Sequence, residues 1–356
     1  MPRPALDRLL RTVVRALKAP VYPTAVRGAA PMDANTNLFG PHPALREVAR
    51  RIDRLGLNQY PSGNSDPLRD ALAARWGIRR GNVVVGNGSD ELFDLVTKAF
   101  VNPGDRVAFP VPSFVMYPFY GGVNLGRPAP VPLKAADGFA LDVEGILRAK
   151  ARVTLIASPN SPTGTAFPPR ALEAVIRRSA GIVVIDEAYA EFCGQERVRT
   201  AARHPRLIVT RTFSKAYGLA GLRVGYAVGS EAVIDALLRV KPPFNVGAFA
   251  EAAAVAALKG HRFVGRVVRT IRSERVRVAG VLRAMGARPH PSDANFLLVD
   301  VGRPSDAVAR ALGGAGFLVR RMSDWPGLET CLRVTLGPPA LNDRFLRALR
   351  DVLARM

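Results

Sequence analysis

The segment most able to do chemistry surrounds Lys215. It reads Thr-Arg-Thr-Phe-Ser-Lys-Ala-Tyr-Gly-Leu-Ala-Gly-Leu-Arg-Val-Gly and ends at Gly225. A lysine at the end of a buried strand is costly unless its amine is used, and an amine shielded from water is a good nucleophile for imine formation. The hydroxyls of Thr212 and Ser214 and the guanidinium of Arg223 suit a phosphate. The alternative is a lysine at a strand edge whose amine reaches water.

A second candidate is Asp186, which ends the apolar run Ile-Val-Val-Ile. This position places a carboxylate at the carboxyl end of a buried strand, the edge where ligands bind in open α/β sheets. A buried carboxylate needs a partner, and a protonated ring nitrogen is a suitable one. Tyr189 follows three residues later and can face the same crevice. The alternative for Asp186 is a helix N-cap.

A third candidate is the turn Gly-Asn-Gly-Ser-Asp-Glu that follows the apolar run at 83–85. A strand, a glycine turn and a helix start present free backbone N–H groups to an anion, which predicts a phosphate site at Gly88, Ser89 and Asp90. A simple helix cap is the alternative. The turn matches neither G-x-G-x-x-G nor the P-loop pattern, which argues against dinucleotide or nucleoside triphosphate binding.

Two more loops follow apolar runs. One, at 157–164, contains Asn160 and Ser161, and the other, at 110–117, contains Phe114, which can stack on a ring. The five loops together supply a lysine, a carboxylate, a phosphate site, an aromatic ring and an amide. This combination predicts binding of a phosphorylated pyridine that bears a carbonyl group, namely pyridoxal 5′-phosphate.

The elements that must position these loops are short apolar runs that alternate with helical periodicity from about 44 to 240. Such alternation indicates an α/β fold with a largely parallel sheet covered on both faces. The carboxyl edge of that sheet would gather the loops. The predicted strands are 83–85, 106–109, 153–157, 182–185, 207–209 and 224–228.

The two ends of the chain have a different character. An amphipathic helix is predicted at 3–18 and an extended arm at 22–43. A long helical region at about 247–285, strands near 295–301, 317–320 and 331–336 and a last helix at about 341–355 indicate a smaller α+β domain. The predicted division is an N-terminal helix and arm at 1–43, a large domain at 44–245 and a small domain at 246–356.

Composition narrows the possible functions. The 356 residues carry a formal net charge of +22, but the 44 arginines and seven lysines are dispersed and form no basic block. We therefore expect no nucleic-acid partner. No stretch is apolar enough to cross a membrane, and two cysteines support neither a disulfide framework nor a metal site. A cytoplasmic protein is the default expectation.

Taken together, these segments resemble the fold type I pyridoxal-phosphate aminotransferases, and within them the histidinol-phosphate aminotransferases. The resemblance runs from about residue 22 to 352, and the Ser-Lys…Gly-Leu-Arg-x-Gly and Asp-Glu-Ala-Tyr segments are its most specific parts. It implies a large domain with a mostly parallel seven-stranded sheet between helices and a smaller α+β C-terminal domain. It also implies ping-pong transfer of an amino group to a 2-oxo acid by a homodimer with shared sites.

The resemblance also assigns roles around the cofactor. It implies that Lys215 binds pyridoxal phosphate as an imine, that Asp186 pairs with the ring nitrogen, that Tyr189 hydrogen-bonds the ring oxygen and that Phe114 stacks on the ring. Tyr60 matches a tyrosine that reaches the phosphate of the neighbouring subunit. The residues that would surround the phosphate are Ser89, Asp90, Thr212, Ser214 and Arg223.

On the substrate side, Arg333 matches an arginine that binds the α-carboxylate, and Arg320 matches one that receives a distal phosphate. Asn37 lies in an arm that reads Asn-Thr-Asn-Leu-Phe-Gly where these relatives typically show Asn-Glu-Asn-Pro-x-Gly. The family usually has Asn before Pro-Thr-Gly, where this chain has Ser161 preceded by Asn160. Either residue can contact the ring hydroxyl.

Two other functions are compatible with the same fold. A decarboxylase or β-lyase acting on a phosphorylated amino acid would release carbon dioxide or ammonia without an acceptor. A non-enzymatic regulator would carry an added DNA-binding module, and the roughly 40 residues before the predicted large domain are too few for one. The donor and the acceptor stay open at this stage, with histidinol phosphate the leading donor.

Overall fold

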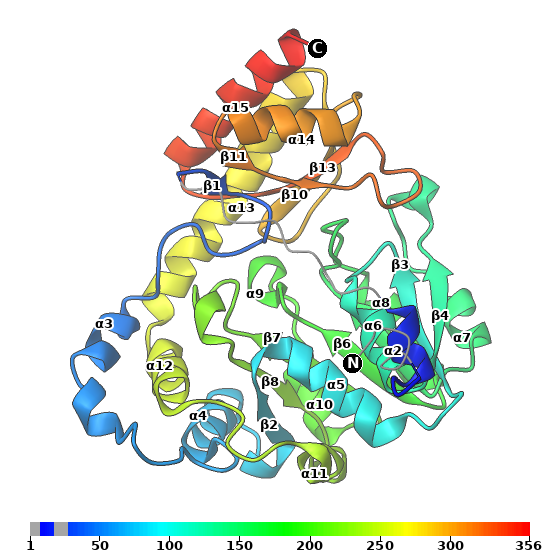
Figure 1. Cartoon of the computed structure of the whole chain (residues 1–356), viewed down its shortest axis with the longest axis vertical. Coiled ribbons are helices and arrows are strands. Elements are labelled where there is room, and N and C mark those ends of the chain that lie inside the picture. Colours follow the sequence, from blue (N-terminus) through cyan, green and yellow to red (C-terminus); the bar gives the residue numbers. More distant parts are fainter. Residues whose placement is uncertain (1–7, 18–27) are drawn as a thin grey trace.

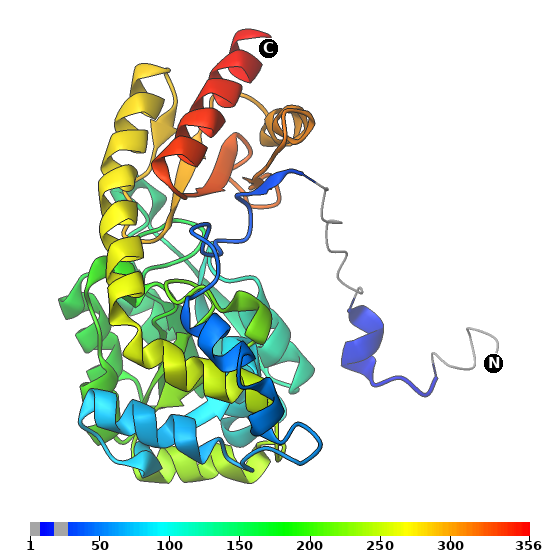
Figure 2. The same cartoon turned by 90° about the vertical axis from the view of Figure 1, so that its left-hand side faces the viewer.

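The computed structural model describes residues 8–17 and 28–356 of the chain. Figures 1 and 2 show a lower body built on one large sheet and an upper, smaller body that carries the C-terminus. A long helix, α13 (His261–Ala284), runs from one body into the other. The expected α/β architecture, with a large sheet and a smaller C-terminal part, is confirmed.

The large sheet has seven strands. All neighbouring strands are parallel except that β8 runs antiparallel to both of its neighbours. Parallel strands bring their carboxyl ends to one edge, so the loops that follow β5, β6 and β7 meet there. In spatial order the strands are β2 (Val83–Gly86), β8 (Gly225–Val228), β7 (Leu207–Thr212), β6 (Ile182–Asp186), β5 (Val153–Ala157), β3 (Arg106–Val111) and β4 (Arg127–Pro132).

Helices cover both faces of this sheet, and the strand residues alternate between them. On β6, Val183 and Ile185 pack in one core cluster with α4 (Asp66–Trp76), α7 (Val143–Arg148), α8 (Pro169–Arg178) and α10 (Val198–Arg203). Ile182 and Val184 face the other cluster, formed with α5 (Gly88–Phe100), α6 (Met116–Val123) and α11 (Glu231–Val240). By this alternation the side chain of Asp186 belongs to the second face.

Strand β4 is missing from the predicted strands because its sequence, Arg-Pro-Ala-Pro-Val-Pro, places proline at every second position. Proline has no N–H to donate to a neighbouring strand and is confined to sheet edges. Strand β4 pairs only with β3 and forms the edge of the sheet, so the unpaired side of its backbone accommodates the three prolines. Tertiary position, and not local propensity, makes this segment a strand.

The smaller body consists of a four-stranded sheet covered by α13, α14 (Ser305–Gly314) and α15 (Pro339–Ala354). The predicted strand at 317–320 is in fact two strands: β11 (Phe317–Leu318) pairs with β1 (Ala30–Pro31) of the arm, and the next strand joins the four-stranded sheet. The arm is thereby attached to this body. In order, the four strands are β12 (Arg320–Arg321), β13 (Cys331–Thr335), β10 (Phe296–Asp300) and β9 (Arg288–Pro289).

The predicted helical region at 247–285 is two helices, α12 (Ala248–Lys259) and α13, separated at Gly260. A side chain at Gly260 would collide with the ring of His42, which explains glycine at the break. Helix α12 contacts α3 (Ala44–Ala49) and α4, although the predicted small domain begins at residue 246. The domain boundary at residues 245 and 246 therefore stays a prediction.

The predicted helix at 3–18 is only partly confirmed: of its described residues, 8–17, those of α2 (Thr12–Ala16) are helical, whereas residues 8–10 form a turn and bend. The rest of the predicted range lies outside the described part of the chain. Arg11, which precedes α2, donates a hydrogen bond to the carbonyl of Val123, at the end of α6, over 3.1 Å. No helix within residues 8–17 and 28–356 is long and apolar enough to cross a membrane. The remaining short helices are α9 (Ala190–Cys193) and the 3-10 turns Ile52–Leu55, Arg80–Asn82, Ala135–Asp137 and Ala220–Leu222.

Candidate active site

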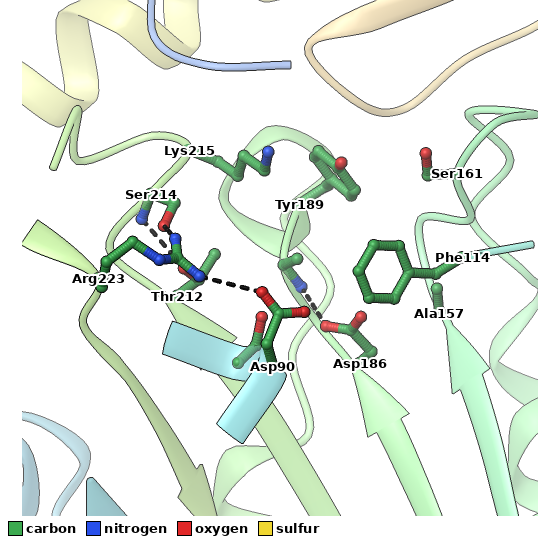
Figure 3. A pocket seen from close by; sticks show the side chains of 12 residues that line it. Asp90, Phe114, Ala157, Ser161, Asp186, Tyr189, Thr212, Ser214, Lys215 and Arg223 are labelled. Atoms are coloured by element: carbon green, nitrogen blue, oxygen red, sulfur yellow. Dashed lines mark hydrogen bonds and ion pairs between the residues drawn. The ribbon is translucent and has the colours of Figure 1, made fainter. Parts of the chain in front are cut away.

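A cavity of about 620 Å³, including its open mouth, is lined by residues of the loops at the carboxyl edge of the large sheet. Most of the predicted cofactor residues line it, and Figure 3 shows their side chains converging from separate loops. Gly88, Asn160 and Tyr60 are the predicted cofactor residues that do not line it. The lining residues are Ser89, Asp90, Phe114, Ala157, Ser161, Asp186, Ala188, Tyr189, Thr212, Ser214, Lys215 and Arg223.

One end of the cavity is built to hold an anion. Helix α5 begins at Gly88, so its first backbone N–H groups point into this end. Arg223 reaches across, with its Nη2 atom 3.0 Å from an oxygen of Asp90 and its Nη1 atom 3.5 Å from the hydroxyl of Ser214. Gly88 has φ +80°, and a Cβ there would occupy the position of the Arg223 guanidinium. Glycine is therefore required for this close approach.

The opposite wall carries a buried carboxylate. Asp186 accepts hydrogen bonds from the hydroxyl of Tyr117 over 2.9 Å, the backbone N–H of Ala188 over 3.1 Å and the hydroxyl of Thr210 over 3.3 Å. Burial raises the pKa of Asp186 from 3.8 to about 6, although these three donors act in the opposite direction. A carboxylate this poorly solvated is stabilised by a cationic partner, and a protonated pyridine nitrogen meets that need.

Tyr117 is a site residue that the sequence reasoning missed. It is fully buried on the first turn of α6, and it is the third residue after Phe114 in the loop that supplies the ring-stacking candidate. Its ring packs edge-on against Phe93 and Phe114, with centroids 5.3 and 5.5 Å apart. The available signal was this spacing, since residues three apart at a helix start share one face.

Lys215 projects its amine into the cavity from the loop after β7 (Figure 3). The Nζ atom donates a hydrogen bond to the carbonyl of Ala34 over 3.0 Å, and it lies 5.7 Å from the centre of the Tyr189 ring. The arm thus supplies a resting partner for the amine from another part of the chain. The amine lies at the cavity and not at a strand edge on the outer surface, which favours a ligand-binding lysine.

The two alternatives for the ring-hydroxyl contact differ in their placement. Asn160 is fully buried, and its amide joins two loops: it accepts from the Ser113 hydroxyl over 2.7 Å and donates to the Pro112 carbonyl in the loop at 110–117, and it donates to Thr163 in its own loop, both over 3.0 Å. Ser161 lines the cavity, where its hydroxyl accepts from Arg333 over 3.0 Å. Of the two, only Ser161 lines the cavity.

A second cavity adjoins the first and shares Asp90, Phe114 and Ser161 with it. Arg320 and Arg333 both line this second cavity and are register partners on the adjacent strands β12 and β13. Two further lining residues that the sequence reasoning missed are Tyr120 and Trp325, which supply aromatic surface. Tyr120 lies beyond the loop at 110–117, and Trp325 lies in the loop after β12. Neither residue has a recognisable sequence motif around it.

Arg333 is held at the junction of the two cavities. Its guanidinium donates to the Ser161 hydroxyl and to the Asp33 carbonyl, 3.0 and 2.5 Å away, and lies 5.5 Å from the centre of the Phe296 ring. Its Nε atom is buried without a hydrogen-bond partner. Because Arg333 lines the second cavity, its guanidinium can bind an anionic ligand group such as a carboxylate.

Two predicted residues lie away from both cavities. Asn37 donates to the carbonyl of Ala216 over 3.0 Å and accepts from the N–H of Phe39 over 2.9 Å, so it ties the arm to the residue after Lys215. Tyr60 is 82% exposed and stacks on Phe244, with ring centres 4.8 Å apart. Within one chain, neither residue contacts the candidate site.

These features fit pyridoxal phosphate. The cavity has an anion cradle at one end, a buried carboxylate that needs a cation at the other, and an aromatic ring and a lysine between them. A Cβ at Gly88 would displace the Arg223 guanidinium, so glycine at this position lets the arginine reach the anion cradle.

Comparison with known proteins gives the same answer. The sequence profile of the aminotransferases of class I and II matches residues 30–349. The histidinol-phosphate aminotransferase of Moorella thermoacetica is 37% identical over 338 residues, which is 92% of this chain and 86% of the relative. Histidinol-phosphate aminotransferase 2 of Pseudomonas aeruginosa is 40% identical over 330 residues, covering 90% and 88% of the two chains.

Solved structures agree with the sequence comparison. The histidinol-phosphate aminotransferase of Sinorhizobium meliloti, in complex with pyridoxal 5′-phosphate, superposes with a TM-score of 0.89 at 28% identity over 97% of this chain and 98% of that one. The L-threonine-O-3-phosphate decarboxylase of Porphyromonas gingivalis has a TM-score of 0.80 at 24% identity over 91% and 99% of the two chains, which shows a shared fold alone. The chain therefore belongs to the class I and II aminotransferases, and it is a pyridoxal-phosphate-dependent aminotransferase of the histidinol-phosphate aminotransferase type.

Proposed function

We propose that this aminotransferase takes its amino group from histidinol phosphate, or from a closely related phosphorylated amine, and passes it to a 2-oxo acid such as 2-oxoglutarate. The observation that carries the proposal is the pairing of Arg320 with Arg333 on adjacent strands at the wall of the second cavity. A phosphate dianion is matched by two guanidinium groups, and a carboxylate by one in bidentate contact. The relatives named above add support.

The cofactor would be held at three places. Ser89, Thr212, Ser214 and Arg223 would bind its phosphate in the cradle at the start of α5, with Gly88 and Asp90 shaping that cradle. Asp186 would pair with the ring nitrogen, and Phe114 would cover the ring face. When bound, pyridoxal phosphate supplies a reactive carbonyl carbon and a ring that withdraws electrons from the donor's Cα.

The chain's own residues would do the remaining work. Lys215 would hold the cofactor covalently and, once released, its Nζ atom would take the Cα proton of the donor. Asp186, buried and charged, would keep the ring nitrogen protonated. Tyr189 would donate a hydrogen bond to the ring oxygen from the wall beside Lys215. Arg333 would orient the substrate anion at the junction of the two cavities.

The assembly and location of the protein are part of the same proposal. We place it in the cytoplasm as a homodimer in which Tyr60 of each subunit completes the phosphate site of the other. The 82% exposure of Tyr60 and its stacking on Phe244 support this placement, because a large aromatic ring held rigid on a surface is suited to a partner. Asn37, for which a substrate contact is predicted, would act by tying the arm to the loop that carries Lys215.

A panel of amino donors tests the substrate. Each donor is mixed with the pyridoxal-phosphate enzyme without an acceptor, and the change in visible absorbance that accompanies amino-group transfer is followed. Histidinol phosphate should react at the lowest concentration, ahead of histidinol, aromatic amino acids and O-phosphorylated amino acids. Equal reactivity of histidinol and histidinol phosphate would contradict a phosphate-binding role for the arginine pair.

A further inference from the structure

Asn35 lies in the arm, buried to 1% exposure, between the smaller body and the side chain of Tyr189. Its backbone N–H donates to the Thr335 hydroxyl over 2.9 Å, and its carbonyl accepts from the Asn295 amide over 3.1 Å. Its φ of +54° is in the left-handed region, which asparagine tolerates better than most residues. The residue is therefore fixed on both sides by β13 and by the segment before β10.

The hydrogen bonds decide which way the Asn35 amide points. The Thr335 hydroxyl already accepts from the Asn35 backbone, so its own proton needs an acceptor, and Oδ1 of Asn35 is 3.2 Å away. The reverse orientation would place a second N–H against this buried hydroxyl and leave its proton without a partner among the described residues. Oδ1 therefore faces Thr335, and Nδ2 faces the Tyr189 hydroxyl 3.0 Å away.

This arrangement settles the direction of the Tyr189 proton. A tyrosine hydroxyl has one proton, and Nδ2 of Asn35 can only donate, so the Tyr189 oxygen accepts from it. The proton must then point to another group. The remaining free side of Tyr189 is the wall of the cofactor cavity.

We infer that Asn35 is a positioning residue that holds the Tyr189 hydroxyl as a hydrogen-bond donor toward the ring oxygen of pyridoxal phosphate. The inference rests on the role proposed above for Tyr189. A donor aimed at an anionic oxygen stabilises it without reorganisation. Asn35 lines neither of the two cavities described above, so it would act only through Tyr189.

The substitution Asn35→Asp tests this, because aspartate has nearly the same shape but can only accept. It would attract the Tyr189 proton and turn the hydroxyl away from the ring oxygen. We expect pyridoxal phosphate to bind about tenfold or more weakly, since a hydrogen bond to a charged group is lost. The pH midpoint of the visible absorption of the bound cofactor should rise by about one unit, since the unprotonated form loses its stabilising donor.

Asn35→Gly is the matched comparison. Glycine accepts the positive φ and removes the side chain, which leaves the Tyr189 hydroxyl free to rotate and still donate to the cofactor. Its effect on affinity and midpoint should be smaller than that of Asn35→Asp. If Asn35 merely packs the arm, the glycine variant, which loses every side-chain contact, should be the more damaged of the two, and that order would overturn the inference.

The double variant Asn35→Asp with Tyr189→Phe completes the design. In the phenylalanine background, Asn35→Asp should change cofactor affinity and midpoint by less than about twofold and 0.3 units, because the hydroxyl on which it acts is gone. An undiminished effect in that background would mean that the added charge or a change in the fold is responsible, and the inference would fail. Tyr189→Phe alone is a separate control: if it leaves both quantities unchanged, the role proposed for Tyr189 is wrong, and the inference falls with it.

Discussion

The hydrogen bond from Tyr117 to Asp186 makes a prediction that can be worked out in detail. Tyr117→Phe removes one hydroxyl and keeps the ring, so the packing against Phe93 and Phe114 is preserved. What is lost is one of the three donors to Asp186, at 2.9 Å the shortest of them. A hydrogen bond to a charged group contributes about 1.5–3 kcal/mol, and one to a neutral group about 0.5–1.5 kcal/mol.

The stability that Tyr117→Phe loses depends on pH, and the structure determines in which direction. The pKa of Asp186 is raised from 3.8 to about 6, so the folded, cofactor-free protein binds this proton more tightly than the unfolded chain. The stability that protonated Asp186 contributes is therefore present at low pH and lost as the pH rises through about 6, a loss of about 3 kcal/mol. Removing the Tyr117 donor raises the pKa of Asp186 further and deepens this loss.

Urea unfolding of the cofactor-free protein between pH 4 and 8 measures the effect. The free energy of unfolding of Tyr117→Phe should lie about 0.5–1.5 kcal/mol below that of the unmodified protein near pH 4 and about 1.5–3 kcal/mol below it at pH 8. Glu187, whose pKa burial raises to about 7, titrates in the same range, but it is present in both proteins and cancels in the difference. Thr210→Val removes the longer, 3.3 Å bond and should give the same trend with a smaller size.

A pH-independent difference would refute this reasoning, because it would mean that Tyr117 contributes packing alone. The same variant should also bind pyridoxal phosphate more weakly at pH 7, since a larger fraction of Asp186 is then neutral and cannot pair with the ring nitrogen. If stability changes as predicted but cofactor affinity does not, Tyr117 tunes the Asp186 carboxyl, and Asp186 has no role in binding the ring.

Three other predictions concern single side chains. Lys215→Ala should abolish the borohydride-trapped adduct with pyridoxal phosphate in peptide mass mapping and lower turnover by at least about 10²-fold, the range of a lost acid–base group; retained turnover would contradict its role. Arg320→Ala should raise KM for a phosphorylated donor about tenfold or more while changing KM for 2-oxoglutarate less. Steady-state kinetics with both substrates measure this, and an equal rise in the two KM values would contradict a phosphate-binding role for Arg320. Glu187, a buried acid 3.1 Å from Arg211, has its pKa raised by burial to about 7. In Glu187→Gln the free energy of unfolding should therefore fall less between pH 5 and 8 than in the unmodified protein. An identical pH profile of stability would exclude Glu187 as a titrating group.

Much of the candidate site could be predicted because its parts are local. The lysine, the carboxylate and the glycine turn each sit directly after an apolar run, and strand ends in a parallel sheet meet at one edge. Lys215, Asp186 and Ser89 were therefore placed together by their positions along the chain, and the structure brings all three into one cavity. The cofactor and the family follow from the same set and are confirmed by the comparisons.

Other features depended on contacts between distant segments. The prolines of β4 are tolerated only because that strand forms a sheet edge, and the helical region at 247–285 is broken where Gly260 meets His42. Neither partner is visible from the local sequence. The choice between Asn160 and Ser161 was likewise open, since two adjacent residues of a loop can each face the cavity. The hydrogen bonds of Asn160 to Pro112 and Ser113, in a loop more than 40 residues earlier in the chain, turn it away.

The amino-acid sequence by itself determined the chemistry of this protein, because residue types and their order after each strand specify a lysine, a carboxylate and a phosphate cradle at one sheet edge. The tertiary structure alone decided how those groups are tuned. Tyr117 reaches Asp186 from 69 positions away, and Asn35 reaches Tyr189 from 154. A hydrogen bond forms over about 3 Å whatever the separation of its partners along the chain, so no local sequence pattern predicts these two hydrogen bonds.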